Sequence, residues 1–206
     1  NLIPVKKVNN DGSNLVEIGK SEAARKAFWL QMRVNEEIAK GVRMKDMPEE
    51  WFARLEENRK NIMVTSVDVL CCNRLMDQMA LDEAKEKMLA LLHENYLAGV
   101  YKNLLIFELS FLELLEGKAA EYTEETNQRQ IAAFAKAMKN FPSILRWQYA
   151  KALLFDKNCD EAEKIKAAFD KMSKSYPHPC EIEGEKELMQ LVDHKAAEAE
   201  NAPETL

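Results

Sequence analysis

The residues VTSVDVLCCNRLMDQMALDEAKEKMLALLHEN, at positions 64–95, decide the fold of this chain. Apolar side chains recur there every three or four residues, the spacing of one face of an α-helix, in two stretches at 64–79 and 81–95. Neither stretch shows the sustained alternation of apolar and polar residues that is typical of a strand. The pattern therefore predicts two α-helices joined by a short turn, which is an antiparallel helical hairpin.

The helical pattern continues downstream to near the end of the chain. Breaks at Gly117, Pro142, near Asn158 and at Pro177 separate further predicted helices at 98–116, 124–140, 143–156, 159–175 and 181–197. Only six glycines and six prolines occur in 206 residues, too few for a many-turned β-sandwich and very few for a nucleotide-binding α/β fold. We expect an all-α protein.

Upstream of position 61 the pattern predicts one long and one short helix. Ser21 caps the long helix, which runs to about Lys40 and is closed by Gly41. Its buried face is expected to hold six apolar residues: Ala24, Ala27, Phe28, Met32, Val34 and Ile38. Pro48 opens the short helix, which turns Trp51 and Phe52 toward the core. Because Trp29 and Trp51 each flank an apolar stripe, both are expected to be protected from solvent.

The order of helices resembles a degenerate array of tetratricopeptide repeats over roughly residues 64–176. Such repeats need small residues where the two helices of a hairpin approach closely, and Asp82-Glu83-Ala84 and Asp160-Glu161-Ala162 begin two second helices 78 residues apart. The resemblance implies antiparallel hairpins stacked as an α-α superhelix with a concave binding face. An ordinary helical bundle is the alternative.

Four regions follow from these patterns. Residues 1–20 are predicted to be an irregular arm, 21–60 a helical lead-in, 61–180 the tetratricopeptide-like array, and 181–206 an acidic terminal helix and tail. The last region holds eight acidic residues and two lysines. We interpret it as a solvated terminus.

Charge and hydropathy exclude two classes of partner. The net charge is −6 and the pI is about 5.3, and no basic stripe is present to neutralise phosphates, which argues against nucleic acid. The mean hydropathy is −0.41, and no apolar run approaches the roughly 20 residues of a membrane-spanning helix. We therefore expect a protein partner and no membrane insertion by these residues, and we leave a homodimer open.

The residues that commonly carry catalysis are sparse. The three histidines are His93 at a helix end, His178 between two prolines, and His194 in the polar terminal helix. No Gly-rich phosphate loop, G-x-S-x-G or H-E-x-x-H motif occurs, and adjacent glutamates read as solvated helix faces. The sequence predicts no enzyme, no cofactor and no metal site, with Cys180, His178 and His194 matching no zinc pattern. The four cysteines, Cys71, Cys72, Cys159 and Cys180, contain no CxxC and suggest buried thiols in a reducing compartment.

Aromatic residues gather in and after the apolar helix at 98–116. We favour a central position for this helix, because it is apolar nearly all round. A groove lined by Tyr101, Phe107, Phe111 and Trp147 is the alternative, and it would bind a protein partner or make the chain a small-molecule sensor.

The first twelve residues, NLIPVKKVNNDG, resemble the second metal-binding motif of site-2 proteases, the intramembrane zinc metallopeptidases. In that family an Asn-x-x-Pro stretch leads to an Asp-Gly whose carboxylate completes a zinc site, and GVRMKDMPEEWF at 41–52 also looks like bacterial members. The resemblance implies that Asp11 is a zinc ligand only in an intact parent protein, with Asn1 and Pro4 shaping the site. Asp11 lies two residues further from Pro4 than is common, and Lys6 and Ser13 replace a usual Pro and Gly.

Together these observations predict a non-catalytic helical-repeat domain for protein interaction or regulation. By the resemblance, it is the tail of a bacterial membrane metallopeptidase-like protein, on the cytoplasmic side of the membrane. A stand-alone helical adaptor and a small-molecule sensor are the alternatives.

Overall fold

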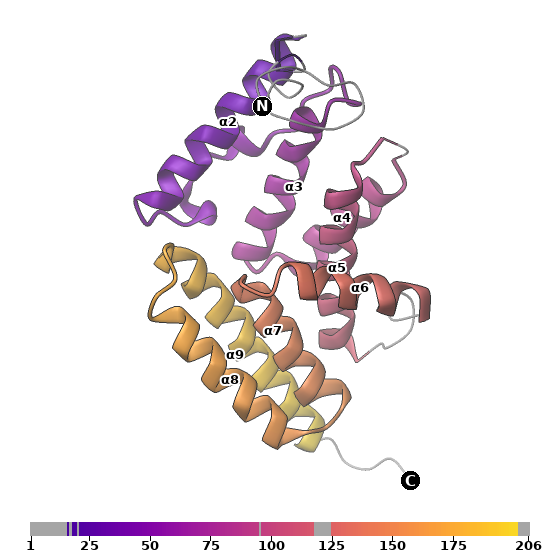
Figure 1. Ribbon diagram of the computed structural model, residues 1–206, viewed down its shortest axis with the longest axis vertical. Helices are drawn as coiled ribbons and strands as arrows, with labels where there is room; N and C mark the ends of the chain where they lie inside the picture. The colour runs from indigo at the N-terminus through magenta and orange to yellow at the C-terminus, as the bar shows by residue number, and fades with distance from the viewer. Residues whose placement is uncertain (1–15, 17, 20, 95, 118–124, 202–206) are drawn as a thin grey trace. The chain divides into compact units, whose positions relative to one another are not determined.

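The computed structural model describes residues 16, 18, 19, 21–94, 96–117 and 125–201, and all regular structure within them is helical (Figure 1). The prediction of an all-α fold is confirmed. Most of the predicted arm at 1–20 lies outside the described residues.

Two compact units divide the chain, at Asn1–Lys102 and Asn103–Leu206. The first contains α2 (Glu22–Ala39), η1 (Met44–Asp46), η2 (Glu49–Phe52), α3 (Ile62–Asp77) and α4 (Leu81–Leu92). Helix α5 (Gly99–Glu116) begins at the end of the first unit and lies mostly in the second, with α6 (Glu125–Ala137), α7 (Pro142–Ala150), η3 (Lys151–Phe155), α8 (Cys159–Ser173) and α9 (Pro179–Asn201).

Helix α2 begins and ends as its sequence predicts. The Ser21 hydroxyl accepts a 3.1 Å hydrogen bond from the Ala24 amide, which satisfies one of the free N–H groups of the first turn. Gly41 follows the helix with φ +87°, a left-handed conformation that glycine adopts without strain.

The buried face of α2 differs from the predicted one. Ala23, Ala24, Ala27 and Leu30 pack with Val64 and Val67 of α3 to form the core of the first unit. These alanines let α3 approach closely, and Val34 and Ile38 are buried as predicted, but the aromatic residues of α2 lie on its other face. Phe28, Trp29 and Met32 are exposed, with Trp29 retaining 53% of its accessible surface. The predicted burial of these three side chains is wrong, whereas Trp51 packs against the core and Phe52 is buried.

The segment GVRMKDMPEEWF is held against the end of α3. Arg43, which is buried, donates from Nε and Nη2 to Oδ1 of Asp77 at 3.0 and 2.6 Å. The amide of Lys45 donates to the other carboxylate oxygen at 2.9 Å. Because one carboxylate satisfies three N–H groups, it fixes the position from which η1 and η2 continue along α3.

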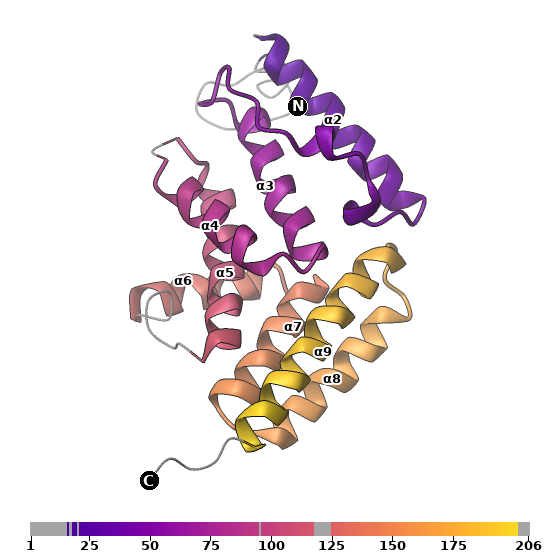
Figure 2. The ribbon, with the colours of Figure 1, turned by 180° about the vertical axis from the view of Figure 1, so that it is seen from behind.

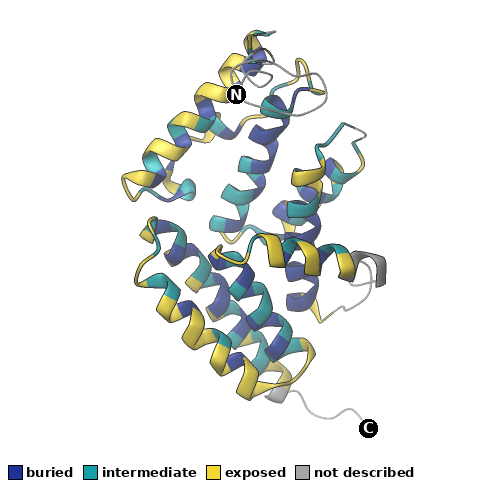
Figure 3. Cartoon of the chain, in the orientation of Figure 1, coloured by how far each residue is buried: buried dark blue, intermediate teal, exposed yellow. Residues whose placement is uncertain are grey.

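In the second unit, α7 packs against both α8 and α9 (Figures 1 and 2). Tyr149 on α7 donates a hydrogen bond to Asp193 on α9. Helix α7 passes directly into a π-helical turn at η3, in which the Asp156 amide donates to the carbonyl of Lys151 at 2.9 Å, five residues back. Figure 3 shows the inward faces of these helices buried and the outward faces exposed.

Hairpin α3–α4 and the hairpin of α7–η3 with α8 match in their residue positions at an offset of 78. The first members end at Asp77 and Phe155, and the second members begin at Leu81 and Cys159. The turn of each contains a non-glycine residue with positive φ, Met79 and Lys157. Further pairs at this offset are buried in both hairpins, among them Asp68 and Arg146, Cys72 and Ala150, and Ala84 and Ala162.

Candidate functional site

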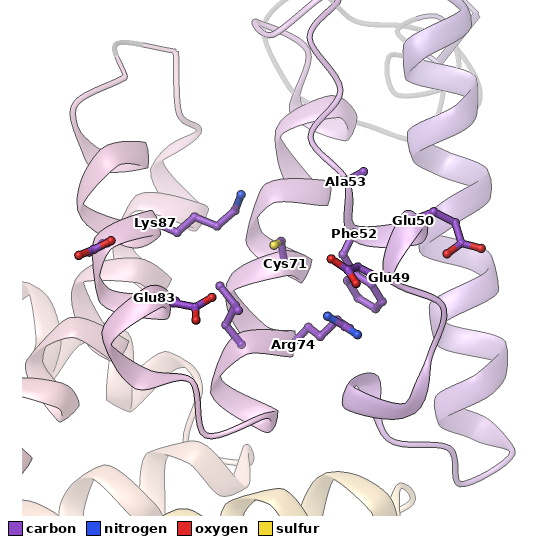
Figure 4. Close-up of a pocket in the computed structure, with 10 residues that line it drawn as sticks. Glu49, Glu50, Phe52, Ala53, Cys71, Arg74, Glu83 and Lys87 are labelled. Carbon is purple, nitrogen blue, oxygen red and sulfur yellow. The ribbon is translucent and has the colours of Figure 1, made fainter.

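A hollow of about 810 Å³ lies between η2, α3 and α4 in the first unit. Its lining residues come from three elements and the loop after η2: Glu49, Glu50, Phe52, Ala53, Cys71, Arg74, Leu75, Glu83, Glu86 and Lys87. Figure 4 shows Glu49 on one side and Glu83 on the other, with Cys71 and Arg74 of α3 between them. The hollow is therefore a groove whose base is α3.

The base of the groove is largely apolar. Phe52 is buried at 3% exposure, and Cys71 and Leu75 are half-buried on the face of α3 that looks into the groove. The guanidinium of Arg74 lies 5.3 Å from the centre of the Phe52 ring, a cation–π contact. The Arg74 side chain covers the aromatic ring. The base of the groove therefore combines apolar side chains with one guanidinium group.

The rim of the groove is acidic. Glu49, Glu50, Glu83 and Glu86 are all exposed, and within the described part of the chain none of them forms an ion pair or hydrogen bond through its carboxylate. The two lining cations already have partners, since Arg74 donates to Gln78 at 3.3 Å and Lys87 lies 3.8 Å from Asp68. Four carboxylates and two cations line the groove, so its lining has an excess of negative groups; Figure 4 shows Glu49 and Glu83 turned toward the groove and Glu50 turned away from it.

A buried charged cluster adjoins the groove through Lys87, which lies 3.8 Å from Asp68. Asp68 on α3 is fully buried, and Arg59 Nη1 lies 2.6 Å from its Oδ2. Arg59 also donates to the Tyr96 hydroxyl at 2.9 Å and to Glu94 at 3.3 Å. These contacts tie the loop before α3 and the segment after α4 to the body of the hairpin that carries the groove.

The thiols near the groove are held in the neutral form. Burial raises the pKa of the Cys71 thiol, and the nearby Lys87 ammonium opposes this shift only in part. Burial also raises the pKa of Cys72, one residue further into the hairpin, to about 12. At neutral pH Cys71 therefore offers the groove a small apolar surface and not a thiolate.

Comparisons with protein-family models, with curated proteins and with solved structures found no match to this chain. A functional proposal for this chain therefore rests on its own residues and their geometry.

The predicted aromatic groove residues lie elsewhere. Phe107 and Phe111 are interior residues of the second unit, with 1% and 0% exposure, as the favoured core interpretation expects. Trp147 is half-buried with its ring centre 5.6 Å from that of Phe107. Tyr101 is half-buried and hydrogen-bonds Ser66 and Gln31 of the first unit. Phe107 and Phe111 thus line no surface groove.

The predicted cysteines and histidines are dispersed. Cys72 and Cys180 are buried, but Cys159 is exposed, because it begins α8 on the solvent side; its expected burial is wrong. His93 caps the C-terminal end of α4. Among the described residues, no three His, Cys, Asp or Glu side chains are grouped closely enough to hold a metal ion. Asp11, Asn1 and Pro4 lie outside the described residues.

No helix in the described ranges is both long enough and apolar enough to cross a bilayer.

The acidic groove was not predicted from the sequence. Glu49 and Glu83 are separated by 33 intervening residues, and only the packing of η2 against α3 brings them to one site. One signal was available in the sequence: both glutamates follow the start of a predicted helix, a position exposed at the end of an element.

Proposed function

We propose that this chain is a non-catalytic helical domain that binds a protein partner or regulates one, and that the partner contacts the groove between η2, α3 and α4. The supporting observation is the combination of an apolar base with four carboxylates that have no ion-pair partner among the described residues. Charged side chains in a folded domain are ordinarily solvated, but around an apolar hollow they form the polar rim that is typical of interaction sites.

A tetratricopeptide-like architecture belongs to the same proposal. The offset of 78 residues between the two hairpins supports it, because helix ends, the positive-φ turn residue and small interface residues all recur together. Two 34-residue repeats with a slightly lengthened connection would give a similar spacing. Asp68 and Arg146 occupy the same position in the two hairpins with opposite charge.

A protein segment fits this groove better than a small molecule does. Ligand pockets for small molecules enclose most of their ligand and are lined mainly by apolar and aromatic groups. Here the rim is exposed, and Phe52, the one aromatic residue among the described residues that line the groove, lies under Arg74. The small-molecule alternative depended on Phe107 and Phe111, which are interior.

A matched pair of cysteine variants tests the proposal. Cys71→Trp places a large side chain in the groove, whereas Cys159→Trp adds the same side chain on the exposed start of α8. Each purified protein is used for affinity capture of partners from a lysate of the source organism, followed by mass spectrometry. We expect a partner that is captured by the wild type and the Cys159 variant and lost with the Cys71 variant. Circular dichroism verifies that both variants are folded. Equal capture by all three proteins would contradict the groove assignment.

The relation to site-2 proteases is a separate proposal, and residues 1–12 support it. It proposes that the parent protein is a membrane zinc metallopeptidase, that Asp11 completes its zinc site, and that the helical domain lies on the cytoplasmic side. The coding sequence upstream of Asn1 tests this directly, and it should encode apolar spans and one H-E-x-x-H motif. An open reading frame without them would leave a stand-alone adaptor.

A further inference from the structure

We propose that the groove between η2, α3 and α4 binds a basic amphipathic segment of a protein partner, with apolar side chains facing α3 and lysine or arginine residues along both edges. This inference rests on the proposed function and names the chemistry of the partner at the same site. Three features support it: the two-sided position of the carboxylates, the apolar base, and the engaged state of the lining cations.

The position of the carboxylates sets the charge pattern of the partner. Glu49 and Glu50 come from η2, Glu83 and Glu86 come from α4, and α3 lies between these two elements. A segment that lies along α3 therefore meets negative charge on both of its flanks. Complementary potentials across an interface favour association and disfavour partners of like charge, so the matching segment carries positive charge on both sides of an apolar stripe.

The size and the surface of the groove base determine which apolar side chains of the partner segment can bind there. A volume of about 810 Å³ accommodates several side chains and not a folded domain. Leu75, Cys71 and the aliphatic part of Arg74 provide the contact surface, and the neutral state of the Cys71 thiol keeps that surface free of charge. Leucine, isoleucine or methionine side chains at helical spacing would fit such a surface.

The lining cations do not offer an anion site. Arg74 contacts Phe52 and donates to Gln78, and Lys87 faces the buried Asp68 and the Cys71 thiol. Arg74 is thus held over an aromatic ring and Lys87 is directed at a buried carboxylate, while the four rim carboxylates have no ion-pair partner among the described residues. An acidic peptide or a phosphate would meet net repulsion here.

The test uses a charge swap in the full chain. The probe is a fluorescein-labelled synthetic 14-residue helix with a leucine stripe flanked by lysines, and its counterpart carries glutamate in place of every lysine. The double variant Glu49→Lys/Glu83→Lys is compared with Glu163→Lys/Asp170→Lys, which makes the same change in net charge on the exposed surface of α8. Fluorescence anisotropy at low and high salt gives the affinities, and sedimentation gives the oligomeric state.

We expect the lysine probe to bind the wild type and the α8 variant alike, and to bind the groove variant at least about tenfold more weakly. The groove variant should prefer the glutamate probe, and added salt should weaken all of these complexes. Equal affinity of the lysine probe for all three proteins would overturn the inference. A wild-type dimer that the groove variant alone converts to monomer would also overturn it, because a second copy would then occupy the groove.

The two proposals fail separately. If the Cys71→Trp variant loses its partner but the probes show no charge preference, the partner chemistry is wrong and the interaction site stands. If the Cys71 variant keeps the partner while the lysine probe still follows the charge swap, the groove binds basic segments but is not the site of the captured partner.

Discussion

The indole N–H of Trp147 donates a 2.8 Å hydrogen bond to the hydroxyl oxygen of Ser110, and this bond joins α7 to α5 in the second unit. Ser110 is fully buried and donates in turn to the carbonyl of Phe107 at 2.8 Å. The hydroxyl therefore links the indole of one helix to the backbone of another inside the second unit.

Removal of this hydroxyl should destabilise the second unit. In Ser110→Ala the Trp147 N–H loses its acceptor, and a buried donor without a partner costs about 1–3 kcal/mol. Urea unfolding monitored by circular dichroism measures the loss. Ser175→Ala, at an exposed serine beyond the end of α8, is the control and should change stability by less than about 0.5 kcal/mol. A loss of the same small size in both variants would mean that the bond contributes little.

A long side chain at Ala150 should separate the helices of its hairpin. Ala150 is fully buried, whereas Ala168, on α8, is exposed. Ala150→Arg should lower the free energy of unfolding by about 1–3 kcal/mol or more through overpacking, and Ala168→Arg should leave it nearly unchanged. Thermal unfolding of the two variants provides the comparison. Melting temperatures that fall equally would show that position 150 is not a close contact.

Stability should fall at alkaline pH, in part because of Cys72. The folded state raises the pKa of this thiol from about 9.0 to about 12, so between these values the folded chain keeps a proton that the unfolded chain releases. The stabilisation is complete below pH 9 and decreases by about 1.4 kcal/mol per pH unit as the pH rises toward 12. Cys72→Ala, although less stable at pH 7, should lose less stability between pH 9 and 10.5 than the wild type does. Urea unfolding under reducing conditions measures both slopes; parallel slopes would exclude Cys72 as a source.

The order of thiol modification should follow exposure. Cys159 is exposed, Cys71 is half-buried with a raised pKa, and Cys72 and Cys180 are buried. Iodoacetamide at pH 7.5 should therefore modify Cys159 first, Cys71 more slowly, and the buried pair only on unfolding. Peptide mapping by mass spectrometry gives the order. Faster reaction of Cys71 than of Cys159 would indicate a thiolate in the groove.

Local patterns were sufficient to predict the helices of this chain. The segments predicted at 64–79 and 98–116 are observed at Ile62–Asp77 and Gly99–Glu116, because helical periodicity and breaking residues act within one segment. The buried side of α2 was harder, since Phe28 and Met32 continue a plausible apolar stripe. The buried side of α2 is determined by the close approach of α3 to its alanine face. This packing depends on both helices, so the sequence of α2 alone does not reveal it.

The candidate site could not be predicted in the same way. Its charge depends on which glutamates lack a partner, and the sequence does not show that Lys87 faces Asp68 while Glu83 faces the groove. The sequence offered an aromatic groove instead, but two of its residues, Phe107 and Phe111, are interior residues of the second unit. The same types of side chain occur in protein cores and in binding sites. The two roles can be distinguished only when the packing of the chain is known.

The π-helical turn at Lys151–Phe155 bears on how this protein can change length during evolution. Such a turn accommodates one residue more than an α-helical turn, so a change of one residue in length can be absorbed there without rotating the residues before it. Loss of one residue between 151 and 155 would return the segment to a regular α-helix and keep α7 and α8 in phase. A deletion inside α3 would instead rotate Asp68 or Cys72 by about 100° and break the core. Relatives of this chain should therefore differ in length at the π turn and not in α3.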